Sequence, residues 1–238
     1  MDKQQVIFTD LDVIDYKEAW DYQENLLQQN VAIKSEARKS TPEILPFLLP
    51  TIHHLLFCEH PPVFTLGKSG NINHVLLSKE QLFQKGIQFF QTNRGGDITF
   101  HGPQQIVGYP ILDLEKFKTD IGLYLRNIEE VVIETIAEWG IKGERSKGET
   151  GVWIDTAIPG RERKICAIGV RCSRWITMHG FALNVNTDLD YFNHIIPCGI
   201  QNKQVTSMEK ETGNKIDLKE VKKILQSKFE AIFQAELI

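Results

Sequence analysis

Residues 164–171 read Lys-Ile-Cys-Ala-Ile-Gly-Val-Arg, and residues 175–185 read Trp-Ile-Thr-Met-His-Gly-Phe-Ala-Leu-Asn-Val. Both stretches are rich in apolar and β-branched residues, so both predict strands. Two successive strands without an intervening helix break strict βαβ alternation, which favours a mixed sheet. Alternation along the first strand predicts two faces, one with Lys164, Cys166 and Ile168 and the other with Ile165, Ala167 and Gly169. The small residues Ala167 and Gly169 leave room for a bulky ligand.

The rest of the chain predicts helices that cover this sheet. Apolar residues at helical spacing run from Ile121 to Trp139, and capping pairs begin helices at Asp15, through about Gln29, and at Asp217. Ser78 and Gln81 begin a shorter helix that ends at Gly86. Further strands are expected at 53–58, 63–66, 87–90, 105–114 and 151–154, and loops at 34–50 and 155–163. We expect an α/β (α+β) fold, a mixed sheet flanked by helices.

Composition narrows the class of protein. The 238 residues suit one domain, 1–238, with a sizeable core, and the net charge of −4 disfavours binding to nucleic acid. No stretch approaches the ~20 apolar residues of a membrane span, and the first residues do not resemble a signal peptide, so we expect a cytoplasmic protein. The four cysteines form no C-x-x-C pair, so we expect free thiols and no structural metal site. Because no stretch is apolar enough to span a bilayer, we expect no membrane partner either.

One cysteine lies in a turn. Pro197-Cys198-Gly199 combines a residue with fixed φ and a residue of unusual conformational freedom, a pattern typical of an exposed turn. A thiol in such a turn is accessible, and nearby backbone N–H groups could stabilise an oxyanion. We interpret Cys198 as a candidate nucleophile, with a buried structural cysteine as the alternative. For Cys58, Cys166 and Cys172 we expect packing roles.

A second unusual stretch is Arg94-Gly95-Gly96-Asp97-Ile98-Thr99-Phe100-His101-Gly102-Pro103. Adjacent glycines allow a backbone to approach a ligand closely, and Arg94, Thr99 and His101 can present polar groups to it. The stretch contains neither nucleotide-binding fingerprint, so a phosphate cradle is disfavoured, and an ordinary hairpin is the alternative. We assign His101 and His179 to a pocket and not to a metal site, because no carboxylate-rich ligand set accompanies them.

Three segments together resemble a known family. They are Glu59–Gly67, Arg94–His101 continued to Tyr109, and Lys164 with His179–Asn184 and Pro197–Ile200. The R-G-G-x-x-T-aromatic-H pattern and the Pro-Cys-Gly triplet resemble the lipoyl(octanoyl) transferases, the octanoyltransferases of lipoate biosynthesis. The resemblance covers about residues 55–208 and implies the catalytic fold of biotin and lipoate protein ligases.

The resemblance also implies a reaction. The family moves an octanoyl group from octanoyl-acyl carrier protein to one lysine of a lipoyl domain, in 2-oxoacid dehydrogenase complexes or in the glycine-cleavage H protein. Cys198 matches the nucleophile that carries the acyl group as a thioester, and Lys164 matches its acid/base partner. No cofactor is implied beyond the phosphopantetheine of the carrier. The implied acyl-site residues are Arg94, Gly95, Gly96, Asp97, Ile98, Thr99, Phe100, His101, Ala167, Ile168, Gly169, Gly180, Phe181 and Ala182.

Two other functions remain open. An ATP-dependent lipoate or biotin protein ligase would share the implied fold and would need no cysteine at position 198. The biotin-type G-R-G-R-x-G loop is missing from the sequence. A non-catalytic acyl-binding relative would keep the pocket and would be expected to lose Cys198 or Lys164, yet both are present.

Overall fold

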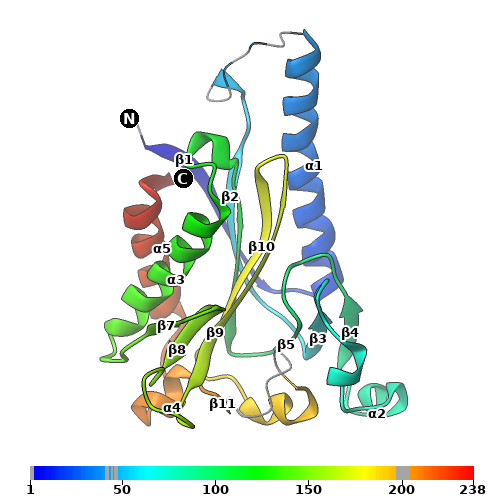
Figure 1. The fold of residues 1–238 in the computed structure, drawn as a ribbon, viewed down its shortest axis with the longest axis vertical. Coiled ribbons are helices and arrows are strands. Elements are labelled where there is room, and N and C mark those ends of the chain that lie inside the picture. The colour runs from blue at the N-terminus through cyan, green and yellow to red at the C-terminus, as the bar shows by residue number, and fades with distance from the viewer. Residues whose placement is uncertain (1–2, 41–42, 44, 46–47, 197–203) are drawn as a thin grey trace.

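The computed structural model describes residues 3–40, 43, 45, 48–196 and 204–238. Within these residues nine strands form one sheet in the order β12-β1-β2-β6-β10-β9-β8-β7, with β11 paired to β9 (Figure 1). The strands of this sheet are β1 (Gln4–Val13), β2 (His53–Glu59), β6 (Gln105–Ile111), β7 (Glu144–Ser146), β8 (Glu149–Ile154), β9 (Arg163–Ser173), β10 (Ile176–Asn184), β11 (Gln204–Val205) and β12 (Ala235–Leu237).

The sheet is mixed, as predicted. β1 runs parallel to β12 and to β2, whereas β2, β6, β10, β9, β8 and β7 pair antiparallel in succession. β6 and β10 are buried along their whole length, because helices cover both faces of the sheet there. The two predicted strands at 164–171 and 175–185 form the β9–β10 hairpin near the centre of this sheet.

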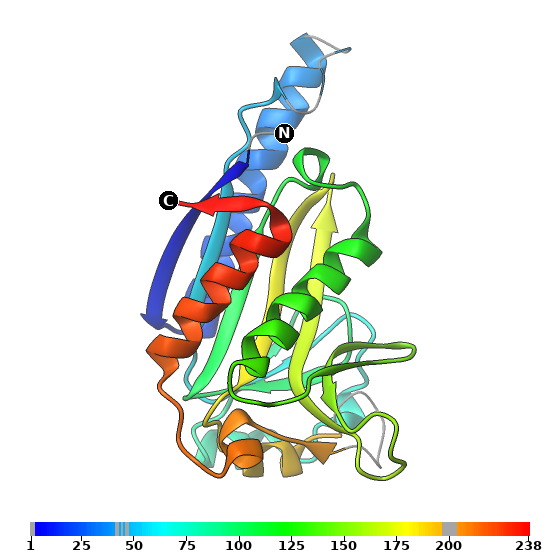
Figure 2. The same cartoon turned by 90° about the vertical axis from the view of Figure 1, so that its left-hand side faces the viewer.

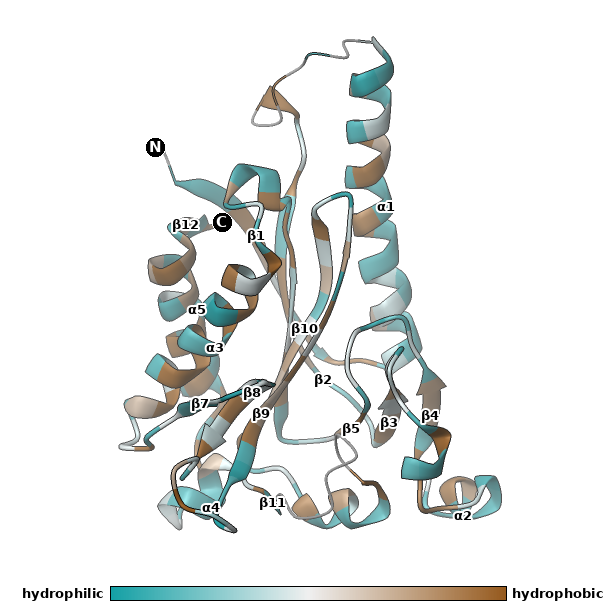
Figure 3. Cartoon of the chain, in the orientation of Figure 1, coloured by the Kyte–Doolittle hydropathy of each residue, from teal (hydrophilic) through white to brown (hydrophobic). Residues whose placement is uncertain are grey.

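Helices lie on the two faces of the sheet (Figures 1 and 2). α1 (Tyr16–Ser40) packs on one face through Leu26 and Leu27, and α3 (Ile121–Ala137) and α5 (Leu218–Phe233) pack together on the other. Figure 3 shows that the hydrophobic sides of these helices face the sheet. Among the described residues, no helix is long and apolar enough to cross a membrane.

A smaller sheet lies beside the main one. Its order is β4-β3-β5, and its strands are β3 (Val63–Leu66), β4 (Gln88–Gln91) and β5 (Ile98–His101). The short elements are α2 (Lys79–Gln84), α4 (Met208–Thr212), η2 (Ile72–His74), η3 (Leu114–Lys116) and η4 (Leu189–His194). α2 begins with the predicted capping box, in which the Ser78 side chain accepts from the Gln81 amide and the Gln81 side chain accepts from the Ser78 amide.

The prediction of a loop over 34–50 is wrong at its start, because α1 continues to Ser40. A buried ion pair anchors this part of the helix. The Lys34 side chain is fully buried, and its Nζ lies 2.7 Å from Asp113 and 2.6 Å from Glu115. The polar residues that suggested a loop are thus held by acidic partners far away in sequence. Of the remainder, residues 41–42, 44 and 46–47 lie outside the described part of the chain. The predicted loop at 155–163 is a turn up to Arg163, where β9 begins.

β9 departs from the predicted alternation at Lys164. In the β8–β9 pairing, Lys164 lies opposite Trp153 and Cys166 lies opposite Val152. Neighbouring residues of β8 point to opposite faces, so the side chains of Lys164 and Cys166 also do. Ile165 is the additional residue of a β-bulge, and it packs in the same core as Cys166. The predicted grouping of Lys164 with Cys166 on one face is therefore wrong.

Three of the four cysteines lie in the described residues, and all three are free thiols. Cys58 and Cys166 are buried in the core, as predicted, and burial raises the pKa of both thiols. Cys172 is exposed near the turn of the β9–β10 hairpin, so its predicted packing role is wrong.

Candidate active site

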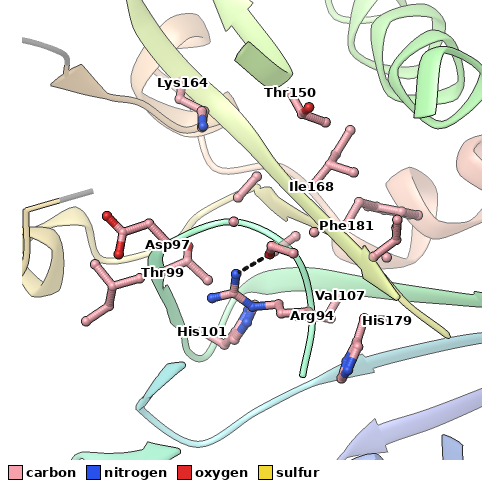
Figure 4. Close-up of a pocket in the computed structure, with 18 of the residues that line it drawn as sticks. Arg94, Asp97, Thr99, His101, Val107, Thr150, Lys164, Ile168, His179 and Phe181 are labelled. Carbon is pink, nitrogen blue, oxygen red and sulfur yellow. Dashed lines mark hydrogen bonds between the residues drawn. The ribbon is translucent and has the colours of Figure 1, made fainter. Parts of the chain in front are cut away.

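The stretch Arg94–Pro103, which contains β5, is called the glycine-rich stretch below. A cavity of about 790 Å³ opens where β9 and β10 of the main sheet meet this stretch. Fourteen of the sixteen predicted site residues line it, namely Arg94, Gly95, Gly96, Asp97, Ile98, Thr99, His101, Lys164, Ala167, Ile168, Gly169, Gly180, Phe181 and Ala182. Figure 4 shows Lys164 at one end of this cavity and His101 and His179 towards the other. The structure therefore brings together segments that are far apart in the sequence.

Two predicted residues are not among the lining residues. Phe100 faces away from the cavity into the core of the small sheet, where its ring stacks on Tyr191 with centroids 4.5 Å apart. Its neighbours Thr99 and His101 point to the cavity, because successive residues of a strand alternate. Cys198 lies outside the described residues, so its predicted role as nucleophile stays a prediction.

Lys164 reaches the cavity because of the bulge in β9. Its Nζ lies 4.5 Å from the centroid of the Trp153 ring, a distance at which an ammonium is attracted to an aromatic face. The Lys164 side chain passes over Gly151, whose φ of +127° favours glycine. A Cβ at position 151 would lie 3.3 Å from Cε of Lys164 and 2.6 Å from the Cys166 carbonyl oxygen. Glycine at 151 thus gives the lysine its path to the cavity.

The chain on both sides of the Pro-Cys-Gly triplet is anchored at this cavity. On the C-terminal side, Val205 pairs with Lys164, and the Thr206 amide donates to the Lys164 carbonyl at 2.9 Å. On the N-terminal side, the Ile196 amide donates to the His74 carbonyl at 2.8 Å. His74, Lys164 and Val205 all line the cavity, so the described residues that precede position 197 and follow position 203 are fixed at its wall.

The glycine-rich stretch is fastened to β9 and to β3. The Gly95 amide donates to the Val170 carbonyl at 2.9 Å, and Arg94 Nη2 donates to the Thr65 hydroxyl at 2.9 Å. Arg94 is buried, and its Nη1 also donates to the Gly95 carbonyl at 3.0 Å. The guanidinium therefore holds the loop's shape while it contributes positive charge to the cavity wall.

The cavity extends over both faces of β9. Ala167 pairs with Ala182, and Gly169 pairs with Gly180, on the face that carries the glycine-rich stretch. Ile168 pairs with Phe181 on the face that packs against α3. The additional lining residues on the α3 side are Ile121, Leu125, Gly148, Glu149 and Thr150. Small residues on one face and apolar side chains on the other suit an extended aliphatic ligand.

Two of the three histidines that line the cavity, His101 and His179, are held neutral by burial. Burial lowers the pKa of His101 well below its usual value and that of His179 to about 3. His101 Nδ1 lies 2.9 Å from Gln105 Oε1, and His179 Nε2 lies 2.8 Å from Asn93 Oδ1, so each donates to an amide oxygen. Both histidines line the pocket, as predicted. Among the residues that the structure describes, no group of three or more His, Cys, Asp or Glu could hold a metal ion.

Several lining residues were not singled out from the sequence. Tyr16 comes from α1 and stacks on His101 with ring centroids 5.9 Å apart, and Tyr109 bonds to His60 at 2.8 Å through its hydroxyl. Tyr109 ends one of the segments that carried the family resemblance, so a signal for it was present. His74 lies in a polar connection without a motif, and only the fold brings it to the cavity.

Comparison with known proteins gives the family. Residues 15–230 match the lipoyl protein ligase A/B catalytic domain. A curated octanoyltransferase of Christiangramia forsetii is 57% identical over 228 residues, which cover 95% of this chain and 95% of the relative. An octanoyltransferase of Flavobacterium johnsoniae is 55% identical over 230 residues, covering 96% of this chain and 97% of the relative.

Solved structures show the same fold at low sequence identity. A bipartite lipoate protein ligase from Thermoplasma acidophilum aligns with a TM-score of 0.69 at 16% identity and covers 100% of this chain and 86% of that one. A lipoate-protein ligase A bound with ATP aligns with a TM-score of 0.67 at 14% identity, covering 100% and 88%. These neighbours confirm the predicted lipoate-ligase-like fold. The chain thus belongs to the lipoyl protein ligase A/B catalytic family and, within it, is an octanoyltransferase of protein lipoylation.

Proposed function

We propose that this octanoyltransferase works through an acyl-enzyme, in which Cys198 carries the octanoyl group as a thioester and Lys164 moves the protons. The acyl donor is octanoyl-acyl carrier protein. The acceptor is one lysine of a lipoyl domain, in the 2-oxoacid dehydrogenase complexes or in the glycine-cleavage H protein. The reaction requires neither a metal nor a nucleotide, and we place it in the cytoplasm, where free thiols such as those of Cys58 and Cys166 persist.

The anchoring of the chain around Cys198 carries this proposal. Val205 pairs directly with Lys164, and Ile196 is bonded to His74 at the rim of the same cavity. Both described neighbours of the segment 197–203 are therefore held beside the cavity that Lys164 lines. Since a nearby ammonium favours the thiolate form of a cysteine, this placement supports Lys164 as the partner of Cys198.

The first half-reaction acylates the enzyme. The Cys198 thiolate attacks the carbonyl carbon of the donor thioester, and the bond from that carbon to the phosphopantetheine sulfur breaks. The departing sulfur takes a proton from the Lys164 ammonium, which leaves Lys164 as a neutral amine. Exchange of one thioester for another needs no further energy source.

The second half-reaction acylates the acceptor. The acceptor lysine, as its neutral amine, attacks the carbonyl carbon of the Cys198 thioester and gives one proton to the Lys164 amine. An amide bond forms, the carbon–sulfur bond breaks, and both the Cys198 thiolate and the Lys164 ammonium are restored. An amide is more stable than a thioester, so this step proceeds without ATP.

The lining of the cavity supports an octanoyl chain as the bound group. Ala167, Gly169 and Ala182 leave space beside the backbone, and Ile168 and Phe181 supply apolar surface. Burial of an alkyl chain is favourable by about 0.8 kcal/mol for each CH₂ group. The predicted binding role of Arg94–His101 applies in this proposal to the residues that face the cavity, and Phe100 contributes only to the packing behind them.

The test is the intact mass of the protein after incubation with octanoyl-acyl carrier protein without ATP. The wild type should gain one octanoyl group that hydroxylamine removes, Cys198→Ser should gain none, and Lys164→Ala should be acylated slowly. Matched controls are Cys172→Ser and Lys142→Ala, which alter an exposed thiol and an exposed amine. Loading of a lipoyl domain from free octanoate only when ATP is present would contradict the proposal and indicate a ligase.

A further inference from the structure

A hydrogen-bonded pair of side chains at the cavity, His74 and Asp97, takes no part in the proton transfers and bond changes described so far. His74 Nδ1 lies 2.5 Å from Asp97 Oδ2, and both residues line the cavity. Their side chains are 22% and 12% exposed, so the pair is reached by solvent at the cavity rim and is not part of the hydrophobic core. Asp97 belongs to the glycine-rich stretch, and His74 belongs to η2.

The Asp97 side of the pair is rigidly connected to the strand that carries Lys164. The Asp97 carbonyl accepts from the Gly67 amide at 3.1 Å, and its Oδ1 accepts from the Asn71 amide at 3.2 Å. Two residues earlier, the Gly95 amide donates to Val170 of β9 at 2.9 Å. The position of the Asp97 carboxylate is thus fixed relative to β9.

The His74 side of the pair is connected to the segment before Cys198. The His74 carbonyl accepts from the Ile196 amide at 2.8 Å, and the Leu76 amide donates to the His194 carbonyl at 2.9 Å. Between these two bonds, Val75 forms an antiparallel bridge with Ile195. Movement of His74 would therefore move residues 194–196, which directly precede Pro197 and Cys198 in the sequence.

We propose that His74 and Asp97 are positioning residues for the nucleophile. This inference rests on the proposed role of Cys198. The Asp97 carboxylate holds the His74 imidazole, and the backbone of residues 74–76 then sets where residues 194–196 deliver the thiol. The pair thus holds residues 194–196 relative to β9, and the Val205–Lys164 pairing holds residues 204–205 relative to the same strand.

The pair should act on the rate of acylation and not on folding, and replacement of His74, which has no proposed contact with the acyl chain, should also leave donor binding unchanged. Its members are partly exposed, and the adjacent core contacts of the small sheet are made by other side chains, such as Phe64 and Ile87. A misplacement of reacting groups by about 1 Å can cost roughly a hundredfold in rate. We expect His74→Ala and Asp97→Ala to slow the single-turnover acylation of Cys198 at least about tenfold.

Replacement of His74 by two amides tests the geometry. The side-chain nitrogen of asparagine occupies about the position of Nδ1, whereas that of glutamine occupies about the position of Nε2. His74→Asn should keep a donor for Asp97 and acylate nearly as fast as the wild type, and His74→Gln should be as slow as His74→Ala. Asn73→Ala is the matched control, since Asn73 is exposed in the same turn and does not line the cavity.

The experiment measures three quantities for each variant: the acylation rate constant by rapid-quench mass spectrometry, the donor concentration at half-saturation, and the melting temperature. For the His74 variants the inference predicts a loss in the rate constant alone, and the rate constant of the His74→Ala/Asp97→Ala double variant should be no lower than that of either single variant. The inference is overturned if the rate loss of the double variant equals the product of the two single losses. It is also overturned if only the donor concentration at half-saturation changes, or if His74→Asn and His74→Gln are acylated at the same rate. The amide pair decides the matter even if the alanine variants do not fold.

Failure of this inference can be told apart from failure of the proposed function. If the wild type forms an adduct that Cys198→Ser lacks and the His74 and Asp97 variants form it equally fast, only the positioning role is refuted. If the wild type forms no adduct with octanoyl-acyl carrier protein, both the acyl-enzyme and the positioning role are refuted.

Discussion

Gly169 touches the glycine-rich stretch so closely that its replacement by alanine should displace the loop. A Cβ at position 169 would lie 2.9 Å from the Gly95 carbonyl oxygen and 3.2 Å from Cδ of Arg94. An ordinary contact of this kind needs about 3.4 Å, so the loop must retreat by roughly half an ångström. Gly169 has no left-handed φ, and the expected strain is therefore purely steric.

The size of the effect follows from this displacement. Overpacking of a close contact typically costs about 1–3 kcal/mol. For a chain of this length each kcal/mol lowers the melting temperature by about 2–4 °C, so Gly169→Ala should melt roughly 2–12 °C lower. A shift of half an ångström in groups that position the substrate should slow acylation about tenfold, if 1 Å costs about a hundredfold.

Calorimetry and single-turnover acylation with octanoyl-acyl carrier protein measure the two effects. Gly95→Ala is the matched control for stability, because it alters the other side of the same contact and its Cβ would meet only the Val170 carbonyl oxygen, at 3.4 Å. That variant should melt within about 1 °C of the wild type. A wild-type melting temperature and rate for Gly169→Ala, or an equal loss of stability in Gly95→Ala, would refute the reasoning.

Three further predictions concern stability and reactivity. Lys34→Met leaves the buried carboxylate of Asp113 without its ammonium partner and should lower the free energy of unfolding, measured by chemical denaturation, by about 3–5 kcal/mol. Lys17→Met removes an exposed ion pair and should lower it by less than about 1 kcal/mol. Burial lowers the pKa of His60 from 6.5 to about 4, so the unfolded chain binds a proton that the folded chain does not, and stability should fall as pH falls through this window. His60→Gln should flatten the pH dependence of the urea midpoint, and an unchanged slope would contradict the assignment. In the Cys198→Ser variant, Cys172 should be the first described thiol alkylated by iodoacetamide, and peptide mapping that found a buried thiol modified first would contradict this.

Local signals in the sequence were sufficient where the structure obeys local rules. The Ser78–Gln81 pair predicted both the start of α2 and its two reciprocal hydrogen bonds. The apolar spacing of 121–139 predicted α3, whose buried residues include Ile128, Val132 and Ile136. Such features depend on residues three or four apart, so the chain carries them regardless of its partners.

Features that depend on distant residues could not be predicted in the same way. The end of α1 is stabilised by the ion pair between Lys34 and Asp113. A pattern of neighbouring residues cannot predict a partner that is so far away in the sequence. Phe100 lies within a motif of lining residues, yet it points into the core of the small sheet because its strand alternates. The motif identified the strand of the site, whereas only the fold decides which of its side chains face the cavity.

The bulge in β9 separates two kinds of evolutionary constraint within four adjacent residues. Ile165 and Cys166 both pack in the core, and Lys164 and Ala167 both line the cavity. Selection at positions 165 and 166 should therefore act on the volume and hydrophobicity of the side chain. Selection at position 164 should act on the proposed proton transfer, and selection at position 167 on the space left for the acyl chain. If the same four residues alternated regularly, with no bulge, the lysine would share the face of Cys166 and point towards the core. Insertions and deletions in this strand should consequently be tolerated far less than substitutions of its buried residues.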